Sequence, residues 1–381
     1  MTSWEGRSFE VTVGPVAHGG HCVARHEGRV VFVRHALPGE RVIASVTEDR
    51  GGSFCRADAV TVLSPSPDRV EPPCPVAVPG GCGGCDWQHA TWDAQRSLKA
   101  AVVAEQLSRL AGVDMPVEVE ALPGGPLDWR TRVRMTVDSA GRPGFLAHRS
   151  HRVIPVADCP IAAPGTVDAV VGRTWEPGSS LTIAVDATAR THLGDSAVAV
   201  ERAARREWRV SGFWQAHPDA ADIYAEVVAA WSGLRSGESA WDLYAGVGLF
   251  AAVLASQVGE AGAVMAVESY RPAAVEAAEN LSDLPQVRVF AGRVEAVLRA
   301  GEGPDPSVVV LDPPRRGAGR EVVDAIAARG TARVVYVACD PAALARDVAT
   351  FAGHGFGLRR LRAFDAFPMT HHVECVALLE R

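Results

Sequence analysis

The chain has 381 residues, of which 48% are hydrophobic and 22% charged, which is ample apolar material for two or three globular domains. Its formal net charge of −7 excludes a global positive field for nucleic acid, so any such binding must come from local patches. Neither a signal-peptide pattern nor an apolar run of membrane-spanning length is found, and we expect a cytoplasmic protein without a membrane partner. Its eight cysteines are then expected to be reduced, metal-bound or catalytic.

Residues 1–64 predict a small β-barrel. Short β-type runs at 9–13, 30–33, 41–46 and 57–63 alternate with glycine and proline turns. The segment that starts at His18-Gly-Gly-His-Cys-Val-Ala-Arg and ends at Val42 resembles a TRAM domain, an RNA-binding barrel found ahead of several RNA-modifying enzymes. The resemblance implies an arm that holds RNA; the alternative is a barrel that only packs against the next domain.

Residues 65–209 form a second predicted domain, marked by cysteines. Cys74, Cys82 and Cys85 lie within twelve residues among glycines and prolines, and Cys159 follows much later. Four thiolates suit either zinc or an iron–sulfur cluster. The three-plus-one spacing, with proline after the first and last cysteine, favours a cluster over the paired cysteines of zinc fingers. A redox Cys-x-x-Cys pair is the third interpretation, and it lacks the βαβ context that it needs.

The same domain carries a predicted basic surface. A helix is expected at about 92–110 and a strand at 129–137, along which Arg130, Arg132 and Arg134 alternate and so share one face. Six arginines against one acid between Trp129 and Arg152 predict a phosphate-binding surface, with a solvated sheet face as the alternative. We hypothesise that a metal centre supports this RNA-facing surface.

Residues 210–381 alternate strands and helices and predict a doubly wound parallel sheet. Strands are expected at 239–244, 263–267, 287–290, 307–311 and 334–337, followed by an antiparallel pair at 361–367 and 373–379. Gly246-x-Gly248 lies between strand and helix, and Glu268 closes the next strand, which fits a dinucleotide or an S-adenosylmethionine site equally well. Asp312-Pro-Pro at the end of a later strand resembles the motif of class I methyltransferases and favours the second.

Cys339 is the predicted nucleophile. It follows a β-branched strand, and Asp340-Pro341 starts a helix as its N-cap and first residue, so the thiol lies at the carboxyl end of the sheet and at a helix N-terminus. Glu374 begins the last strand and is the predicted base. The alternatives are a buried structural cysteine and a solvated edge carboxylate.

Together these features predict methylation of a pyrimidine carbon. C5 of uracil is a weak nucleophile, and a thiolate that adds to C6 turns the ring into an enolate whose C5 can attack a sulfonium methyl. A base then removes the C5 proton so that the thiol is eliminated. The target base must leave its stack, and Phe213 or Trp214 is expected to stack on it.

Five motifs resemble the TrmA/RumA-type RNA 5-methyluridine methyltransferases, in the branch with a TRAM domain and an iron–sulfur cluster. They are Phe213-Trp-Gln215, the Gly246 loop, Asp312-Pro-Pro-Arg-Arg-Gly, Val337-Ala-Cys339-Asp-Pro and Phe367-Pro-x-Thr-x-His-Val-Glu374. The resemblance implies an α/β fold: a class I, Rossmann-like methyltransferase domain at 210–381, an N-terminal OB-like barrel, and a small α+β iron–sulfur domain between them.

It also implies S-adenosyl-L-methionine held by Gln215, Tyr244, Glu268 and Asp312, and a [4Fe-4S] cluster held by Cys74, Cys82, Cys85 and Cys159. Leu249 and Arg293 depart from the family pattern, in which polar amide residues are frequent at both positions. The expected substrate is a uridine in rRNA or tRNA, with a lean toward rRNA, and the expected state is a monomer. An RNA cytosine C5 methyltransferase, a non-catalytic RNA-binding iron–sulfur protein and, more distantly, a dehydrogenase are the alternatives.

Overall fold

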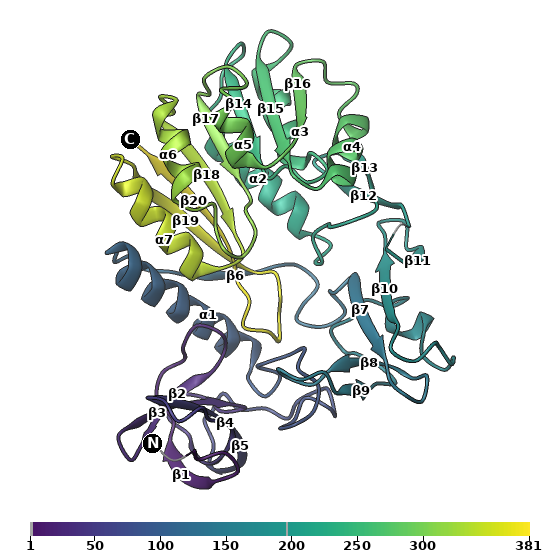
Figure 1. The fold of residues 1–381 in the computed structure, drawn as a ribbon, viewed down its shortest axis with the longest axis vertical. Coiled ribbons are helices and arrows are strands. Elements are labelled where there is room, and N and C mark those ends of the chain that lie inside the picture. The colour runs from purple at the N-terminus through teal and green to yellow at the C-terminus, as the bar shows by residue number, and fades with distance from the viewer. Residues whose placement is uncertain (1–2, 196) are drawn as a thin grey trace.

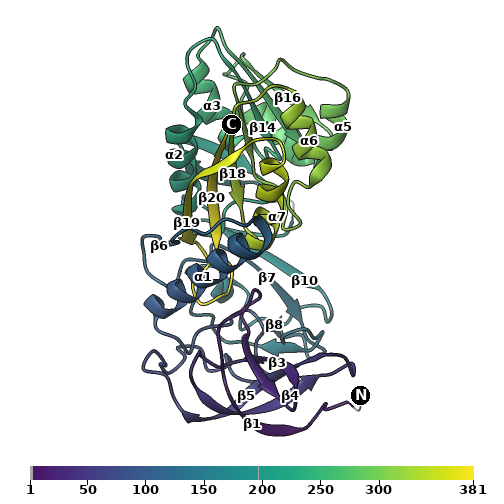
Figure 2. The same cartoon turned by 90° about the vertical axis from the view of Figure 1, so that its left-hand side faces the viewer.

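The computed structural model describes residues 3–195 and 197–381 and arranges them in three regions (Figure 1). The N-terminal strands lie at one end, the catalytic sheet lies at the other, and a small sheet lies beside the junction between them. Helix α1 (Trp92–Gln106) runs between the N-terminal strands and the catalytic sheet, as both views show (Figures 1 and 2). Within the described ranges, no helix is both long enough and apolar enough to cross a bilayer.

The N-terminal region is a five-stranded sheet with β1 and β2 at its edges, a half-barrel arrangement of the strands that the β-barrel prediction expected. Its order is β1-β4-β5-β3-β2, and it packs a core of small aliphatic residues that Trp87 of the following segment helps to close. Strand β2 was not among the predicted strands, because its Cys-Val-Ala-Arg-His has only a short alternation. The strands are β1 (Ser8–Thr12), β2 (Cys22–His26), β3 (Arg29–Arg34), β4 (Arg41–Glu48) and β5 (Phe54–Ser64).

The central sheet has the order β11-β10-β7-β8-β9 and packs its own small core around Met135 and Ile183. Its predicted arginine face is only partly right. Arg132 pairs with Glu201, whereas Arg134 is exposed and Arg130 lines an internal cavity. The strands are β7 (Arg132–Val137), β8 (Pro143–Leu146), β9 (Val153–Pro155), β10 (Ser180–Val185) and β11 (Thr191–Leu193), with a short helix η2 (Val167–Ala169).

The catalytic sheet has eight strands in the order β16-β15-β14-β17-β18-β20-β19-β6. The five neighbouring strands β16, β15, β14, β17 and β18 are parallel, as predicted. Strand β20 is antiparallel to both β18 and β19. The strands are β14 (Ser239–Leu243), β15 (Ala263–Glu268), β16 (Val287–Ala291), β17 (Val308–Leu311), β18 (Arg333–Ala338), β19 (Gly357–Asp365) and β20 (Glu374–Glu380). The helices are α2 (Ala220–Ser232), α3 (Leu249–Val258), α4 (Arg271–Asn280), α5 (Val294–Arg299), α6 (Arg320–Ala328) and α7 (Pro341–Ala352).

The edge of this sheet comes from an unexpected part of the chain. Strand β6 (Val119–Ala121) pairs in parallel with β19, and the π-helical turn η1 (Leu107–Ala111) that extends α1 packs its Leu107 in the same core as Phe351 of α7. Residues 103–121 therefore contribute to the core of the catalytic sheet, whereas Leu98 and Val102 of α1 pack against the N-terminal core; the sequence division puts all of them with the cysteines. A hairpin of β12 (Ala199–Ala203) and β13 (Arg206–Val210) then leads into the catalytic region.

Candidate active site

The candidate active site lies where the parallel strands end. Tyr244 follows β14 and Asp312 follows β17, two strands that pair in register through Leu243 and Leu311. Glu268 is the last residue of β15. Because carboxyl ends of parallel strands meet at one edge of the sheet, these three side chains line one cavity.

The strand register also brings the predicted nucleophile and base together. Ala338, the last residue of β18, pairs with Cys375 of the antiparallel strand β20. Cys339 directly follows the first of these residues and Glu374 directly precedes the second, and both line the cavity. Asp340 caps α7 as predicted, because its carboxylate accepts the N–H of Ala343 at 2.8 Å.

The predicted donor loop lines the same cavity. The Gly246 N–H donates to Glu268 Oε2 at 2.9 Å, which ties the loop to the neighbouring strand. Tyr244 has a φ of 67°, a left-handed conformation that costs about 1–3 kcal/mol and is typical of functional sites. Gly248 does not line the cavity: it starts α3 with a φ of 100°, and an added Cβ would lie 2.6 Å from Leu281 Cδ1.

The remaining predicted residues are distributed between the cavity and its rim. Gln215 lines the cavity, as do Leu249 and Arg293, which were left out of the predicted site. Of the two candidate stacking residues, Trp214 is 5% exposed and packs against Trp208, whereas Phe213 is 76% exposed. Phe213 is therefore the ring that is open to an incoming base.

Burial makes three acidic groups of the cavity, those of Asp312, Glu374 and Cys339, hard to ionise. It raises the pKa of Asp312 to about 7. Burial, and then the negative charge of Asp312, raises the pKa of Glu374 well above its ordinary value. Burial, with the charges of both carboxylates, raises the pKa of the Cys339 thiol to about 12. A cation bound near these groups would make each of the three ionisations easier.

Two further side chains in the cavity had no predicted role. Arg315 lies 3.2 Å from His372, measured between Nη2 and Nε2, and its positive charge opposes the rise in the pKa of both Cys339 and Glu374. Burial lowers the pKa of His372 to about 3, so the neutral ring can accept this hydrogen bond. The signal for His372 was its position two residues before Glu374, on the same face of an extended segment.

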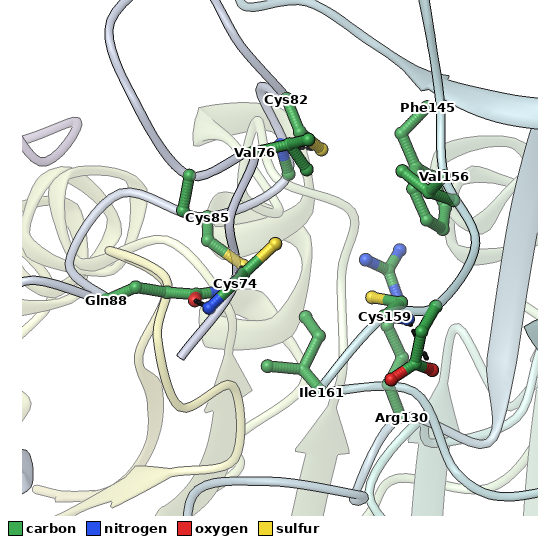
Figure 3. Close-up of a pocket in the computed structure, with 13 residues that line it drawn as sticks. Cys74, Val76, Cys82, Cys85, Gln88, Arg130, Phe145, Val156, Cys159 and Ile161 are labelled. Carbon is green, nitrogen blue, oxygen red and sulfur yellow. Dashed lines mark hydrogen bonds between the residues drawn. The ribbon is translucent and has the colours of Figure 1, made fainter. Parts of the chain in front are cut away.

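The four predicted metal ligands line a second cavity (Figure 3). Cys74, Cys82 and Cys85 approach from one loop, and Cys159 comes from the opposite wall. Gln88 links two of them, since its amide oxygen accepts the Cys74 N–H at 3.0 Å and its nitrogen donates to Cys85 Sγ at 3.1 Å. The walls are otherwise largely apolar and include Val76, Ala77, Phe145, Val156 and Ile161.

The four cysteine thiols of the second cavity are not gathered closely enough around one position to bind a single metal ion. Among the described residues, no group of three or more His, Cys, Asp or Glu side chains is placed to hold a metal ion. A single zinc ion would need thiolates about 3.8 Å apart, given Zn–S bonds of about 2.3 Å. Burial raises the pKa of Cys85 to about 12, so this thiol needs a cation before it ionises.

Comparisons with known proteins agree with the fold and with the predicted family. The model of the tRNA (uracil-5-)-methyltransferase family matches residues 260–381, and that of the TRAM domain matches residues 3–60. An uncharacterized RNA methyltransferase of Streptomyces coelicolor is 48% identical, over 98% of this chain and 93% of the relative. A 23S rRNA (uracil(1939)-C(5))-methyltransferase of Pseudomonas entomophila is 32% identical, over 98% of this chain and 94% of the relative.

A solved structure has the same fold. The tRNA (uracil-54, C5)-methyltransferase of Pyrococcus abyssi, in complex with S-adenosyl-L-homocysteine, superposes with a TM-score of 0.73. The match is 20% identical in sequence and covers 97% of this chain and 100% of that one. The fold and site thus define a class I methyltransferase with an N-terminal TRAM domain. The chain belongs to the RNA uracil-C5 methyltransferase family.

Proposed function

We propose that this protein transfers the methyl group of S-adenosyl-L-methionine to C5 of a uridine in RNA, with Cys339 as nucleophile and Glu374 as base. The observation that carries the proposal is that both side chains share one cavity with the glycine loop and Asp312. Gln215, Tyr244 and Glu268 hold the methyl donor in this proposal. Gly246 keeps backbone exposed to it, and Gly248 shapes the loop from behind.

In the proposed reaction, Cys339 Sγ adds to C6 of uracil and the electron pair of the C5=C6 bond moves into the enolate. C5 then takes the methyl group, and the donor sulfonium becomes a neutral thioether. Glu374 removes the C5 proton, the C5=C6 bond re-forms and the thiolate leaves. Arg315 supports the first step by favouring the thiolate and stabilising negative charge on the ring.

RNA of the ribosome is the favoured substrate. The relative named for 23S rRNA is 32% identical over nearly its whole length, whereas the likeness to the tRNA enzyme concerns the fold alone. The TRAM domain supplies an RNA-holding arm, and exposed Phe213 stacks on the extruded base. We place the protein in the cytoplasm as a monomer, with domain boundaries near residues 64 and 209 and with strand β6 as an excursion of the central region onto the catalytic sheet.

The proposed function is tested with unmodified 23S rRNA, the methyl donor and the Glu374→Gln variant. Wild-type protein should produce 5-methyluridine in a nucleoside digest. The variant should complete methylation but fail to release the RNA, so a covalent protein–RNA complex should accumulate on a denaturing gel. Formation of 5-methylcytidine would instead support the cytosine reaction, and RNA binding without transfer would support a non-catalytic role.

We also propose that Cys74, Cys82, Cys85 and Cys159 hold a [4Fe-4S] cluster. The donor set of four thiols, the largely apolar walls and the N–H groups directed at sulfur support this proposal. Four thiolates also need not approach one another as closely around a four-iron cluster as they must around a single zinc ion. When bound, the cluster supplies four metal–thiolate bonds that cross-link the cysteine loop to the segment around Cys159.

Cys82→Ser should remove iron and destabilise the fold together. Anaerobically prepared wild-type protein is expected to contain about four irons per chain, as the cluster type requires, with a broad visible absorption band. The variant should lose both and unfold at a lower temperature, because metal–ligand bonds contribute to folding free energy. Cys22→Ser is the control, because this buried thiol of the TRAM domain donates to the Ala36 carbonyl and a hydroxyl can keep that bond. Zinc in place of iron in the wild-type protein would contradict the assignment.

A further inference from the structure

The loop before the proposed base is held mainly from outside the catalytic sheet. Residues 366–373 connect β19 to β20, supply Phe367 and His372 to the cavity, and lead directly into Glu374. The loop extends from the sheet toward the central region and the TRAM domain (Figure 1). What holds it there determines where the proposed base lies.

Backbone contacts clamp the loop at Met369. Its carbonyl oxygen accepts the N–H groups of Asp86 and Trp87 at 2.9 and 3.0 Å, and its own N–H donates to Gln95 Oε1 at 2.8 Å. Met369 has a φ of 66°, a conformation that persists only where surrounding contacts impose it. All three partners precede the central sheet in the chain.

A carboxylate completes the clamp. Asp86 Oδ2 accepts the His371 N–H at 3.1 Å and lies 2.6 Å from His371 Nδ1, while Oδ1 lies 3.3 Å from Arg34 Nη2 of the TRAM domain. The Asp86 side chain is only 9% exposed, so these charge-assisted bonds are shielded from water. One side chain therefore joins the TRAM domain, the loop that carries Cys82 and Cys85, and the loop of residues 366–373.

The clamp is connected to the cavity. The rings of His371 and His372 lie 4.1 Å apart between centroids, and His372 Nε2 contacts Arg315 inside the cavity. We propose that Asp86 is a positioning residue for the methylation reaction: by fixing His371, it sets the path of the backbone that places Glu374. This inference rests on the proposed function, in which Glu374 removes the C5 proton.

The proposal predicts which step suffers. Cys339 lies just before α7. The N-cap of this helix is Asp340, which makes its capping bond without Asp86. Asp86→Ala should therefore leave thiol addition and methyl transfer largely intact and slow proton removal. With unmodified 23S rRNA and S-adenosyl-L-methionine, turnover should fall about tenfold or more, as for a misplaced catalytic group. A covalent protein–RNA complex should accumulate, as in Glu374→Gln.

Asp186→Ala is the matched control, because Asp186 is also a buried carboxylate that pairs with a histidine: its Oδ2 lies 2.7 Å from His192 Nε2, in the central region and away from the loop of residues 366–373. It should show neither effect. Loss of turnover in Asp86→Ala without the covalent complex would overturn the proposal, and so would unchanged turnover. If Glu374→Gln itself forms no complex, the assignment of the base fails instead.

Hydrogen exchange tests, without any reaction, whether the Asp86 side chain holds the loop of residues 366–373 in place. In free protein, Asp86→Ala should raise amide exchange in the peptide covering residues 366–373 by about tenfold or more, because the His371 N–H loses its acceptor and the loop opens locally. Peptides of α3 and β14 should exchange as in the wild type. Unchanged exchange in the loop would overturn the proposal, whatever the activity.

Discussion

Cys339→Ser is expected to lower methyl transfer by roughly 10⁴-fold or more while leaving the fold intact. Serine preserves the size of the side chain, but its hydroxyl is a far weaker nucleophile than a thiolate, so C6 addition fails. Without addition, C5 never gains the electron density that it needs to take a methyl group. The measurement is single-turnover transfer from labelled donor to unmodified 23S rRNA.

The same variant should form no covalent complex with RNA that carries 5-fluorouridine at the target, whereas wild-type protein should be trapped on it. Fluorine at C5 cannot be removed as a proton, so the adduct cannot be released. Cys22→Ser is the control, because this buried thiol donates to the Ala36 carbonyl, a bond that a hydroxyl preserves. Methylation by Cys339→Ser near the wild-type rate would exclude the covalent mechanism.

Lys99→Met is expected to lower the free energy of unfolding by roughly 3–5 kcal/mol. The only lysine of the chain is fully buried, pairs with buried Asp365 and donates to the Phe367 carbonyl at 3.0 Å. Burial lowers the pKa of Lys99, and the negative charge of Asp365 opposes that shift. Removing the amine leaves a buried carboxylate without its cation. Urea unfolding measures the loss.

The double variant Lys99→Met/Asp365→Asn should recover part of this stability, because it removes the unpaired charge and keeps an acceptor for Trp92 Nε1. Arg299→Met is the control, since its pairing with Glu321 is solvent-exposed and should contribute less than about 1 kcal/mol. If Lys99→Met and Arg299→Met lowered the free energy of unfolding by similar amounts, burial of the Lys99–Asp365 pair would not be the cause of the loss.

Much of the catalytic sheet was predictable because its signals are local. The β-branched strand before Cys339, the Asp340-Pro341 cap and the glycine loop each occupy a few consecutive residues, and the structure has the corresponding strand, cap and turn. The predicted TRAM domain and methyltransferase family are confirmed by the comparisons. The roles of the individual side chains stay predictions.

What could not be predicted depends on distant contacts. Strand β6 has three residues and exists because β19 offers it an edge, which no local pattern indicates. The sequence gives no sign that Arg132 has an acidic partner, because Glu201 comes close to it only in the folded chain. Asp86 gave no signal either, since its partners Arg34 and His371 lie 52 and 285 positions away.

Strand β6 also covers one end of the outer edge of the catalytic sheet, where it pairs with residues 363–365 of β19. A truncated chain that begins at residue 210 would retain every proposed catalytic side chain, yet it would lose this pairing and lengthen the open edge of β19. Bare strand edges pair readily with other molecules. Such a fragment is expected to aggregate, and its rescue by adding residues 92–121 as a separate peptide would show that the methyltransferase unit is discontinuous in the chain.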